Sequence, residues 1–562
     1  MKKTPKIAVA SSFESNVEIT DARAQKGPIL KEYIESLGYT MDEVMVLGDS
    51  LNDYSMMSMD FGATVAMGNA VSELKKAAKY ITKSNDELGV AYAIRELLKK
   101  QKINKREIGS SMRLRSKFAV KCAKATSSLI KKLNRGSGVT LPGYVARLID
   151  PNILKELSGQ VRKKTIVTMG TNGKTTTNAI LCKALEHEGQ KVIINRTGAN
   201  MLNGIISAFV LATDKHGNLD ADYACIEVDE IASVGVLPKI EPDCALLTNI
   251  SRDQLDRFGE VDITYNKLMT AVTSVPKTTL IINCDDILSY SLAQESKNAF
   301  VTYGISEQIF DDVSRSEIRE SIFCRKCGKK LEYQFFHYGQ LGLYHCPNCG
   351  WNRPNPEYTA EHVVREDELY SFDMDGIHFD PQIRTPYNIY NTLSAYAALK
   401  TMGAGYEHFK EMIEAFDYGN NRESIFNING ARVQLHLAKN PIGFQQKVSH
   451  VLRDPNPKDI IIQINDTYQD GEDVSWLWDV DFQYLAESNA RKIITAGTRK
   501  YDMALRLKYE DVSCESTDDM RASVLECVEQ GTKNLYVIVN YSGLYQTNHM
   551  LTELEGKGGT ER

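Results

Sequence analysis

The chain has 562 residues, of which 42% are hydrophobic and 25% are charged, and its formal net charge is −6 at pH 7. This length predicts about three or four domains, each with a core of its own. No apolar run reaches membrane-spanning length, and the start of the chain leads into no signal-peptide core, so we expect a cytoplasmic protein. Eleven cysteines in a chain of this length indicate thiols in a reducing compartment and not a disulfide framework.

The first hundred residues predict a small α/β unit. Strands are expected at residues 43–47 and 63–66, and helices at residues 74–79 and 90–99. The polar stretch that follows, residues 101–111, predicts a linker. We therefore expect this unit to be separate from the rest of the chain.

Two motifs of this unit, Lys26–Leu30 and Val46–Asp53, resemble the last two motifs of Cof-type haloacid dehalogenase-like (HAD-like) phosphatases. In that family the lysine steadies a phosphoaspartate and the acids hold Mg²⁺. The family also needs an N-terminal Asp-x-Asp nucleophile, and the first part of the chain offers only Asp21. A phosphatase acting through Asp49 and Asp53 is therefore disfavoured. The unit is interpreted as a partial HAD-like fragment, joined to the rest by gene fusion or by an error in the gene model.

A basic segment comes next. Residues 108–149 contain nine lysines or arginines and no acidic residue. Within them, apolar residues recur at the spacing of one helix face, namely Phe118, Cys122, Ala125, Leu129 and Leu133. They predict a basic amphipathic helix. We favour a helix that packs on its neighbour and leaves its basic face solvated. Contact with an anionic membrane surface or a lipid-linked phosphate stays open as the alternative.

A glycine-rich turn at residues 170–176 follows the apolar run Thr165–Met169 and precedes a helical pattern. In this strand–loop–helix setting, backbone N–H groups wrap a phosphate at the helix N-terminus. Lys174 would neutralise the β- and γ-phosphates, and the Thr175 hydroxyl would reach Mg²⁺. The general P-loop pattern has glycine where Thr168 stands. The nucleotide site is predicted to comprise Gly170, Thr171, Asn172, Gly173, Lys174, Thr175 and Thr176.

Strand and helix patterns alternate from residue 160 to about residue 415, as a doubly wound sheet requires. The segment Asp222–Glu230 predicts a buried strand that ends in acids, where Glu227 is placed to hold Mg²⁺ beside the phosphates. The segment Tyr387–Asn391 opens an alanine-rich helix. A last α/β block starts near residue 416 and has buried-strand candidates at residues 459–464, 492–495 and 534–539.

Two C-x₂-C pairs, separated by eighteen residues, interrupt the alternating pattern: Cys324 with Cys327, and Cys346 with Cys349. Four thiolates at this spacing close a tetrahedron around Zn²⁺. The pattern offers no open coordination position, so we expect a structural zinc ribbon in an insertion at about residues 312–372. The stretch between the pairs is not especially basic, and this disfavours a nucleic-acid-binding ribbon.

In this order, the segments resemble the Mur ligase superfamily. Within it the likeness is closest to the MurT subfamily, the synthetase subunits of lipid II isoglutaminyl synthase, where a Cys₄ ribbon in the central domain is typical. Further segments carry this likeness, namely Arg252–Asp256, Lys439–Phe444 and Asp470–Asp479. Gln254 and Lys439 stand where amino-acid-adding Mur ligases carry histidine. These two changes put a second Mg²⁺ site in doubt and argue against the addition of a whole amino acid.

The resemblance implies an α/β fold class. It places a partial HAD-like α/β fragment at residues 1–105 and a basic N-terminal helical segment of the ligase at residues 112–155. A Mur ligase-like P-loop central domain with the inserted ribbon follows at 156–415, and a C-terminal Rossmann-like α/β domain at 416–562. The family pattern also adds residues to the nucleotide site, namely Asn388, Asn391 and Arg422.

The resemblance also implies an activity, ATP-dependent amidation of the D-glutamate α-carboxyl in the lipid II stem peptide through an acyl phosphate. The chain shows no glutaminase signature, so the family implies a GatD-type glutamine amidotransferase in a heterodimer. Asp470 or Asp473 would complete that partner's triad, although an Asp-Gly turn at the surface explains either residue equally well. The alternative activity is that of a Mur-type or folylpolyglutamate-type amino-acid ligase. No nucleic-acid partner is expected, and a peripheral position at the inner membrane face stays open.

Overall fold

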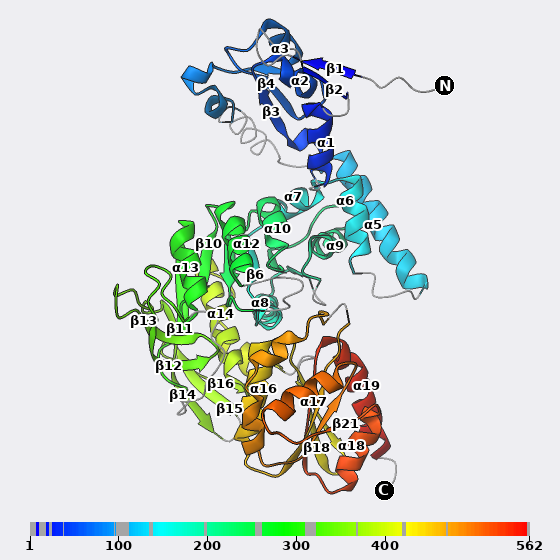
Figure 1. Ribbon diagram of the computed structural model, residues 1–562, viewed down its shortest axis with the longest axis vertical. Coiled ribbons are helices and arrows are strands. Elements are labelled where there is room, and N and C mark those ends of the chain that lie inside the picture. Colours follow the sequence, from blue (N-terminus) through cyan, green and yellow to red (C-terminus); the bar gives the residue numbers. More distant parts are fainter. Residues whose placement is uncertain are drawn as a thin grey trace. The chain divides into compact units, whose positions relative to one another are not determined.

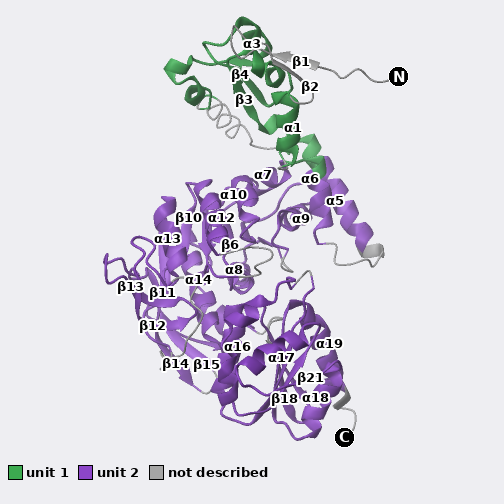
Figure 2. Cartoon of the chain, in the orientation of Figure 1, with its two compact units in different colours: residues 1–117, 148–151 green, residues 118–147, 152–562 purple. Residues whose placement is uncertain are grey.

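Figure 1 shows the computed structural model of the chain. It describes residues 7–10, 18–21, 25–36, 39–94, 96, 112–133, 139–195, 199–252, 261–309, 322–366, 369–418, 423–467 and 470–558. Two compact units can be distinguished (Figure 2), namely residues 1–117 with 148–151, called unit 1, and residues 118–147 with 152–562, called unit 2.

Unit 1 contains a three-stranded parallel sheet of order β3-β4-β5. Its strands are β3 (Met45–Gly48), β4 (Ala63–Ala66) and β5 (Tyr80–Ile81), and its helices include α1 (Lys26–Ser36), α2 (Tyr54–Met57) and α3 (Ser72–Ala77). A separate antiparallel hairpin consists of β1 (Ile7–Ala10) and β2 (Glu18–Asp21). The core contains Phe61 and Leu74, both fully buried. The strands predicted at 43–47 and 63–66 are thus confirmed to within two residues, whereas α1 had no prediction.

The predicted basic helix forms as α5 (Leu114–Leu133) and is followed by α6 (Leu141–Ile149) and α7 (Ile153–Ser158). Its buried face is not the predicted one. It holds small side chains, among them Ala119 and Ala123, whereas Phe118 is 60% exposed and Leu129 is 57% exposed. The expectation that this apolar face packs on a neighbour is therefore wrong, because the small residues allow the closer approach and occupy the contact.

Unit 2 is built on a nine-stranded sheet of order β16-β15-β14-β11-β10-β9-β6-β8-β7. Neighbouring strands run parallel from β7 to β14, and β15 and β16 join antiparallel. The strands are β6 (Lys164–Met169), β7 (Val192–Ile194), β8 (Tyr223–Glu227), β9 (Cys244–Leu247), β10 (Thr279–Asn283), β11 (Phe300–Ile305), β14 (Tyr358–Glu366), β15 (Leu369–Met374) and β16 (Ile377–Ile383). Strands β8 and β9 are buried along their whole length, and β6 and β10 are buried at every residue but the first, as strands covered by helices on both faces must be.

The helices that accompany this sheet are α8 (Lys174–His187), α9 (Leu202–Ala212), α10 (Ser233–Ile240), α12 (Val261–Thr273), α13 (Ile287–Ser296), α14 (Pro386–Met402) and α15 (Phe409–Glu414). Helix α14 is almost entirely buried and packs against α8, the helix that follows the glycine-rich turn. The two helices share one apolar core with the sheet. The sheet thus brings the carboxyl ends of β6, β8 and β9 side by side, the edge where ligands bind in open α/β sheets.

The cysteine pairs flank a separate antiparallel hairpin of β12 (Glu332–Tyr338) and β13 (Leu341–His345). The hairpin is inserted between β11 and β14. Strand β14 and most of β15 fall within the residues expected to form the insertion, 312–372, but belong to the main sheet. None of the eleven cysteines, all of which the structure describes, forms a disulfide, and this agrees with the expected free thiols.

The last part of unit 2 is a six-stranded sheet of order β17-β18-β22-β19-β20-β21. Its strands are β17 (Glu423–Ile428), β18 (Ala431–Leu437), β19 (Lys458–Gln463), β20 (Ala490–Ala496), β21 (Glu515–Ser516) and β22 (Asn534–Val539). Its helices are α16 (Pro441–Arg453), α17 (Lys500–Tyr509), α18 (Met520–Glu529) and α19 (Tyr541–Gly558), with short 3₁₀ helices η6 (Ser475–Asp479) and η7 (Phe482–Glu487). Apolar clusters cover both faces of the sheet. The three buried strands expected from the sequence are confirmed.

Candidate active site

The glycine-rich turn joins β6 to α8 through two glycines with left-handed backbone. Gly170 has φ +114° and Gly173 has φ +91°, a region that side chains disfavour. A Cβ atom at Gly170 would collide with the Thr248 hydroxyl, and one at Gly173 with the Asn391 amide oxygen. Glycine is therefore required at both positions by space as well as by conformation.

The side chain of Lys174 lies across this turn in a buried ion pair. Its Nζ atom lies 2.8 Å from Glu230 Oε1 and donates to the Gly170 carbonyl oxygen at 2.5 Å. Only 9% of the lysine side chain and 3% of the glutamate side chain are exposed. Glu230 is the last acid of the run that the sequence singled out, but it was not assigned a role. The pair holds the ammonium group inside the turn, where an incoming phosphate would meet it.

The segment after β9 holds the turn from one side. Thr171 N–H donates to the Asn249 carbonyl oxygen at 2.8 Å, and Asn172 N–H donates to Asn249 Oδ1 at 3.1 Å. The Thr171 hydroxyl donates to the Ser251 carbonyl oxygen and accepts from the Ser251 N–H, both at 3.0 Å. These bonds fix the turn before any ligand binds, as a preorganised phosphate cradle requires.

A second anchor comes from the start of α16, more than 260 residues later. Asn440 Nδ2 donates to Asn172 Oδ1 at 3.0 Å, while Asn440 Oδ1 accepts from the Gly443 N–H at 2.8 Å and caps α16. The Lys439–Phe444 motif thus contributes a contact to the turn that its sequence position did not reveal.

Glu227 ends β8 and pairs in register with Thr168 of β6, directly before the turn. Its side chain is buried, and Oε1 accepts from Asn200 Nδ2 at 3.2 Å. Asn195 holds the backbone of Glu227 through two further hydrogen bonds. The oriented Glu227 carboxylate at this edge and the hydroxyl of the exposed Thr175 in the first turn of α8 are oxygen donors of the kind that suits Mg²⁺.

Helix α14 contributes the predicted asparagines to the start of α8. Asn391 Oδ1 accepts from the Thr177 hydroxyl at 3.4 Å, and Asn391 Nδ2 donates to Asn388 Oδ1 at 2.9 Å. The structure therefore brings Asn391 against the glycine-rich turn, and Asn388 supports Asn391 from the preceding turn of α14. Arg422 lies outside the described residues, as does Gln254.

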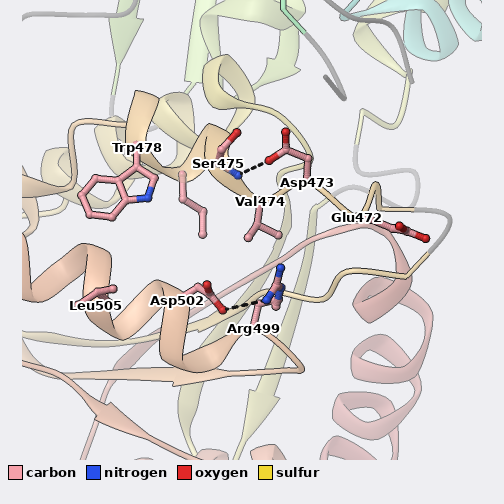
Figure 3. A pocket seen from close by; sticks show the side chains of 9 residues that line it. Glu472, Asp473, Val474, Ser475, Trp478, Arg499, Asp502 and Leu505 are labelled. Atoms are coloured by element: carbon pink, nitrogen blue, oxygen red, sulfur yellow. Dashed lines mark hydrogen bonds and ion pairs between the residues drawn. The ribbon is translucent and has the colours of Figure 1, made fainter. Parts of the chain in front are cut away.

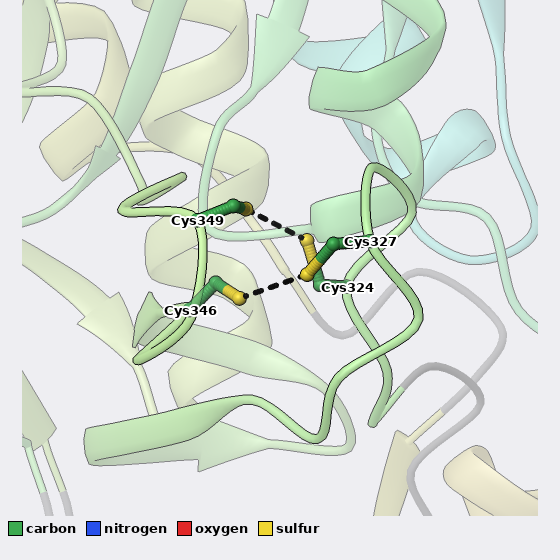
Figure 4. Close-up of side chains that lie close together, drawn as sticks. All are labelled: Cys324, Cys327, Cys346 and Cys349. Atoms are coloured by element: carbon green, nitrogen blue, oxygen red, sulfur yellow. Dashed lines mark hydrogen bonds between the residues drawn. The ribbon is translucent and has the colours of Figure 1, made fainter.

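The four cysteine sulfurs gather at the tip of the inserted ribbon (Figure 4), and their ligand atoms all lie within 4.8 Å of one another. Cys324 and Cys349 sulfurs are 3.5 Å apart, as are those of Cys327 and Cys346. Sulfurs held 2.3 Å from a central zinc ion are about 3.8 Å apart, so the cluster is consistent with Zn²⁺. Hydrogen bonds, that from the Lys329 backbone N–H first, lower the pKa of Cys327 to about 6, whereas hydrogen bonds among the cysteine sulfurs raise the pKa of Cys349.

Behind the cysteines, the ribbon is tied to α14 through a buried polar cluster around Asp285. Arg353 Nε lies 2.6 Å from Asp285 Oδ1, and the Tyr390 hydroxyl donates to Asp285 Oδ2 at 2.6 Å. His337 Nδ1 lies 2.5 Å from the same hydroxyl, and burial lowers the pKa of this histidine. Tyr390 is the neighbour of Asn391, so the ribbon positions the helix that contacts the turn.

A second tie runs from the hairpin to the segment after β9. Gln340 Nε2 donates to the Ile250 carbonyl oxygen and to Asp286 Oδ1, both at 2.6 Å. Asp286 Oδ2 in turn accepts from the Ile250 N–H at 2.8 Å. Ile250 directly precedes Ser251, which holds Thr171. The contacts of Gln340 and Asp285 were missed because the sequence carries no local signal for them.

The two aspartates proposed for the C-terminal region have different surroundings. Asp473 lines a pocket of about 270 Å³ beside Trp478 and Arg499 (Figure 3) and accepts from the Ser475 N–H at 2.7 Å. Hydrogen bonds from Ser475 lower its pKa. Asp470 is buried, and its carboxylate accepts from the Ser542 N–H at 2.9 Å and from the Thr467 hydroxyl at 2.6 Å. Asp470 therefore stabilises the start of α19, whereas Asp473 faces a cavity.

In unit 1, the two phosphatase-like motifs also converge. Lys26 Nζ lies 2.7 Å from Asp53 Oδ1, and the Asp49 N–H donates to Asp53 Oδ2 at 3.2 Å. The lysine side chain is 52% exposed and the aspartate side chain 10%.

Two curated relatives, each named "Lipid II isoglutaminyl synthase (glutamine-hydrolyzing) subunit MurT", match this chain. The one from Staphylococcus aureus (strain COL) is 33% identical over 389 residues, which are 69% of this chain and 87% of the relative. The one from Streptococcus pneumoniae (strain ATCC BAA-255 / R6) is 31% identical over 444 residues, or 78% and 98%. The chain belongs to the MurT family. MurT chains are ligase subunits, so this chain is an enzyme with an amidoligase role, and its Mur ligase fold implies ATP and Mg²⁺.

Two family models match separate parts of the chain, and both agree with its membership of the MurT family. The Mur ligase middle domain matches residues 167–399, and the MurT ligase C-terminal model matches residues 437–544. The glycine-rich turn and the cysteine ribbon fall in the first match, and Asp470 and Asp473 fall in the second. Because MurT is named as a subunit, a partner is implied.

Solved structures support the Mur ligase fold. The pseudomurein peptide ligase type C from Methanothermus fervidus aligns with a TM-score of 0.56 at 18% identity, covering 93% of this chain and 92% of that one. MurF from Acinetobacter baumannii aligns with a TM-score of 0.53 at 15% identity, covering 73% and 80%. At these identities the likeness shows the fold alone, and it confirms the predicted fold class.

The haloacid dehalogenase-like hydrolase model matches residues 1–94. The 5-amino-6-(5-phospho-D-ribitylamino)uracil phosphatase YcsE of Bacillus subtilis is 42% identical over 95 residues, which are 17% of this chain but only 38% of the phosphatase. The N-terminal region thus resembles part of a phosphatase, as predicted. Among the described residues, no helix is long and apolar enough to cross a membrane.

Proposed function

We propose that this chain is the synthetase subunit of a lipid II isoglutaminyl synthase in the cytoplasm. It would convert the α-carboxyl of D-glutamate in the lipid II stem peptide to an amide at the expense of ATP. The observation that carries the proposal is a complete glycine-rich cradle with a buried lysine, in a chain that spans 98% of a MurT relative.

The turn Gly170–Thr176 binds the nucleotide phosphates through the Lys174 ammonium and the backbone N–H groups at the start of α8, since the N–H groups of Thr171 and Asn172 already donate to Asn249. Thr175 and Glu227 hold Mg²⁺, which would neutralise charge on the transferred phosphoryl group. Asn388 and Asn391 line the nucleotide side of α8, and Arg422 completes the site by family pattern. Glu230 keeps the lysine in place until the phosphates compete for it, because a buried ammonium needs an anionic partner.

The reaction has two steps. A carboxylate oxygen of the substrate attacks the γ-phosphorus, and the bond to ADP breaks, which leaves an acyl phosphate. Ammonia then attacks the acyl carbon, phosphate departs with the C–O bond electrons, and the nitrogen loses a proton. The chain's contribution is positioning and charge neutralisation, which are the main sources of rate in phosphoryl transfer.

The ammonia comes from a GatD-type glutamine amidotransferase in a heterodimer, because the sequence has no glutaminase signature of its own. We assign the acid that serves the partner to Asp473. Asp473 is half-buried, is bonded to Ser475 and lines a pocket next to the exposed Trp478, whereas Asp470 is buried and bonded to Ser542 and Thr467. An exposed aromatic side chain beside an ionised acid suits a protein contact. The four cysteines hold a structural Zn²⁺.

The test is the product mass obtained with each nitrogen source. With ATP and ammonium, the chain alone is expected to exchange a hydroxyl for an amino group on lipid II. With glutamine, it is expected to do so only after a GatD-type subunit is added. A mass gain of a whole amino acid would favour the alternative, a Mur-type or folylpolyglutamate-type ligase. Glutamine-driven amidation by the single chain would contradict the proposed division of labour.

A further inference from the structure

Helix α5 exposes its larger apolar side chains instead of burying them. The stripe, defined as Phe118, Cys122, Ala125 and Leu129, follows one helix face at intervals of three and four residues. Phe118 and Leu129 are more than half exposed, while Ala119, Val120 and Ala123 on the opposite face are buried. Single exposed apolar residues are ordinary on protein surfaces, but Phe118 and Leu129 lie on one helix face with the exposed Ala125 and the half-buried Cys122 between them, and such a face indicates a binding surface.

The helix is anchored so that the stripe faces outward. Lys124 Nζ donates to the Thr213 carbonyl oxygen and, at 3.1 Å, to the Asp214 carbonyl oxygen, directly after α9. Helix α6 packs on the same α9, since a Cβ atom at Gly143 would collide with the Asn203 carbonyl oxygen, and the Gly143 N–H donates to the Ser207 hydroxyl at 2.7 Å. Two residues on the other side of α6, Leu141 and Tyr144, are exposed.

The charge of this segment identifies the kind of surface it fits. Residues 108–149 have nine basic residues and no acid, although the whole chain has a net charge of −6. Lys121 lies within the stripe's span and is exposed. A second copy of the chain docking stripe to stripe would bring like charges together, which is unfavourable. A surface with a layer of anionic groups over an apolar layer complements both the apolar stripe and the exposed Lys121.

We propose that α5 is a membrane-docking helix that lies on an anionic phospholipid bilayer, with the Phe118–Leu129 stripe in the acyl boundary and Lys121 at the headgroups. Helix α5 has 20 residues but is not apolar enough to span a membrane, so the contact is peripheral. The inference deepens the proposed function, because a lipid-linked substrate would be presented at such a surface. Its evidence, however, is the exposed stripe and the charge, which do not depend on the reaction.

The experiment measures sedimentation of the full chain with vesicles that contain no lipid II. Vesicles of phosphatidylcholine alone are compared with vesicles of equal parts phosphatidylcholine and phosphatidylglycerol. We expect binding to the anionic vesicles only, and weaker binding as salt is raised. The double variant Phe118→Asp/Leu129→Asp is expected to reduce binding roughly tenfold or more, since it removes two apolar anchors and adds two like charges.

The matched control is Ile263→Asp/Ile377→Asp, which changes two exposed apolar residues on α12 and β16 and should bind as the unchanged chain does. If the stripe variant fails to fold, judged by its melting temperature, Lys121→Glu is used in its place and should weaken binding to anionic vesicles several-fold.

The proposal is overturned if the unchanged chain does not bind anionic vesicles, or if a folded stripe variant binds them as strongly as the unchanged chain does. It is also overturned if the stripe variant instead converts a dimer to a monomer, since a second copy would then cover the stripe. Amidation is measured separately with ammonium, so a failure of docking is distinguishable from a failure of the proposed function.

Discussion

Two regions of this chain place a lysine against a carboxylate just beyond the end of a parallel strand. In unit 2, Lys174 and Glu230 are 2.8 Å apart and almost fully buried, within a turn held by Asn249 after β9, Asn391 of α14 and the Asn440 cap of α16. In unit 1, Lys26 and Asp53 are 2.7 Å apart, but the lysine is half exposed and the region covers 38% of the related phosphatase. Motif geometry can therefore persist in a fragment, whereas a working site needs the surrounding elements that bury and orient it.

The sharpest test of this contrast is Lys174→Ala. Removing the ammonium should lower ATP-dependent amidation about 10³-fold or more, because the developing phosphoryl charge loses its buried counter-charge. The rate with saturating ammonium and lipid II measures the effect. Lys26→Ala serves as the control and should leave this rate unchanged. Full activity in the Lys174 variant would refute the assignment of the turn.

The next largest effect is expected at Asp473. Asp473→Asn should lower the glutamine-dependent rate about 10²-fold or more and leave the ammonium-dependent rate unchanged, since the acid would orient a histidine of the partner. The low pKa of Asp473 keeps it ionised at neutral pH. Asp470→Ala is the comparison, because it removes the oxygen that accepts from the Ser542 N–H at the start of α19 and should cost about 1 kcal/mol of stability with no preference for either nitrogen source. Equal loss with both nitrogen sources in the Asp473 variant would count against its role.

Zinc removal should have a smaller effect that reaches from the ribbon to the glycine-rich turn. We expect one zinc ion per chain by elemental analysis. Cys324→Ser should release it, lower the melting temperature of unit 2, and weaken ATP binding roughly tenfold through the loss of the Gln340 and Asp285 contacts. Cys514→Ser, which alters a cysteine outside the cluster, is the control. A metal-free chain with an unchanged melting temperature would show that the cysteines are not a zinc site.

No effect on amidation is expected from Asp53→Asn, or from deletion of residues 1–100. Both changes break the lysine–carboxylate pair of unit 1, which we take to lie outside the reaction. Rates with ammonium and with glutamine plus partner should match those of the full chain. A loss of activity in Asp53→Asn, a single change that leaves the fold intact, would give unit 1 a part in the ligase that its incomplete motifs do not suggest.

Features that depend on residues adjacent to one another in the chain were predictable from the sequence. The glycine-rich turn, the paired cysteines and the runs of buried strand residues each depend on neighbours along the chain, and the fold class followed from them. The position of Arg422 stays a prediction, since it lies outside the described residues. Glu230 was within a recognised acidic run, yet only the folded chain shows that it is the partner of Lys174.

The contacts that sequence reasoning missed join distant segments. Gln340 meets Ile250 across 90 residues, and Arg353 meets Asp285 across 68. The face of α5 was predicted wrongly for a related reason. Helical periodicity shows that side chains share a face, but it does not reveal whether that face meets the protein or its surroundings, and here Ala119 and Ala123 provide the closer contact.

The hydrogen bonds of the Asn440 side chain make the residue types at positions 172 and 440 depend on each other, although the two positions lie far apart in the sequence. Its oxygen caps α16 and its nitrogen donates to Asn172 of the glycine-rich turn. Aspartate would keep the cap but lose the donor, and serine would be too short to do both. In an alignment of homologues, residues 172 and 440 should therefore vary together, with loss of the amide at one position accompanied by loss of an acceptor at the other.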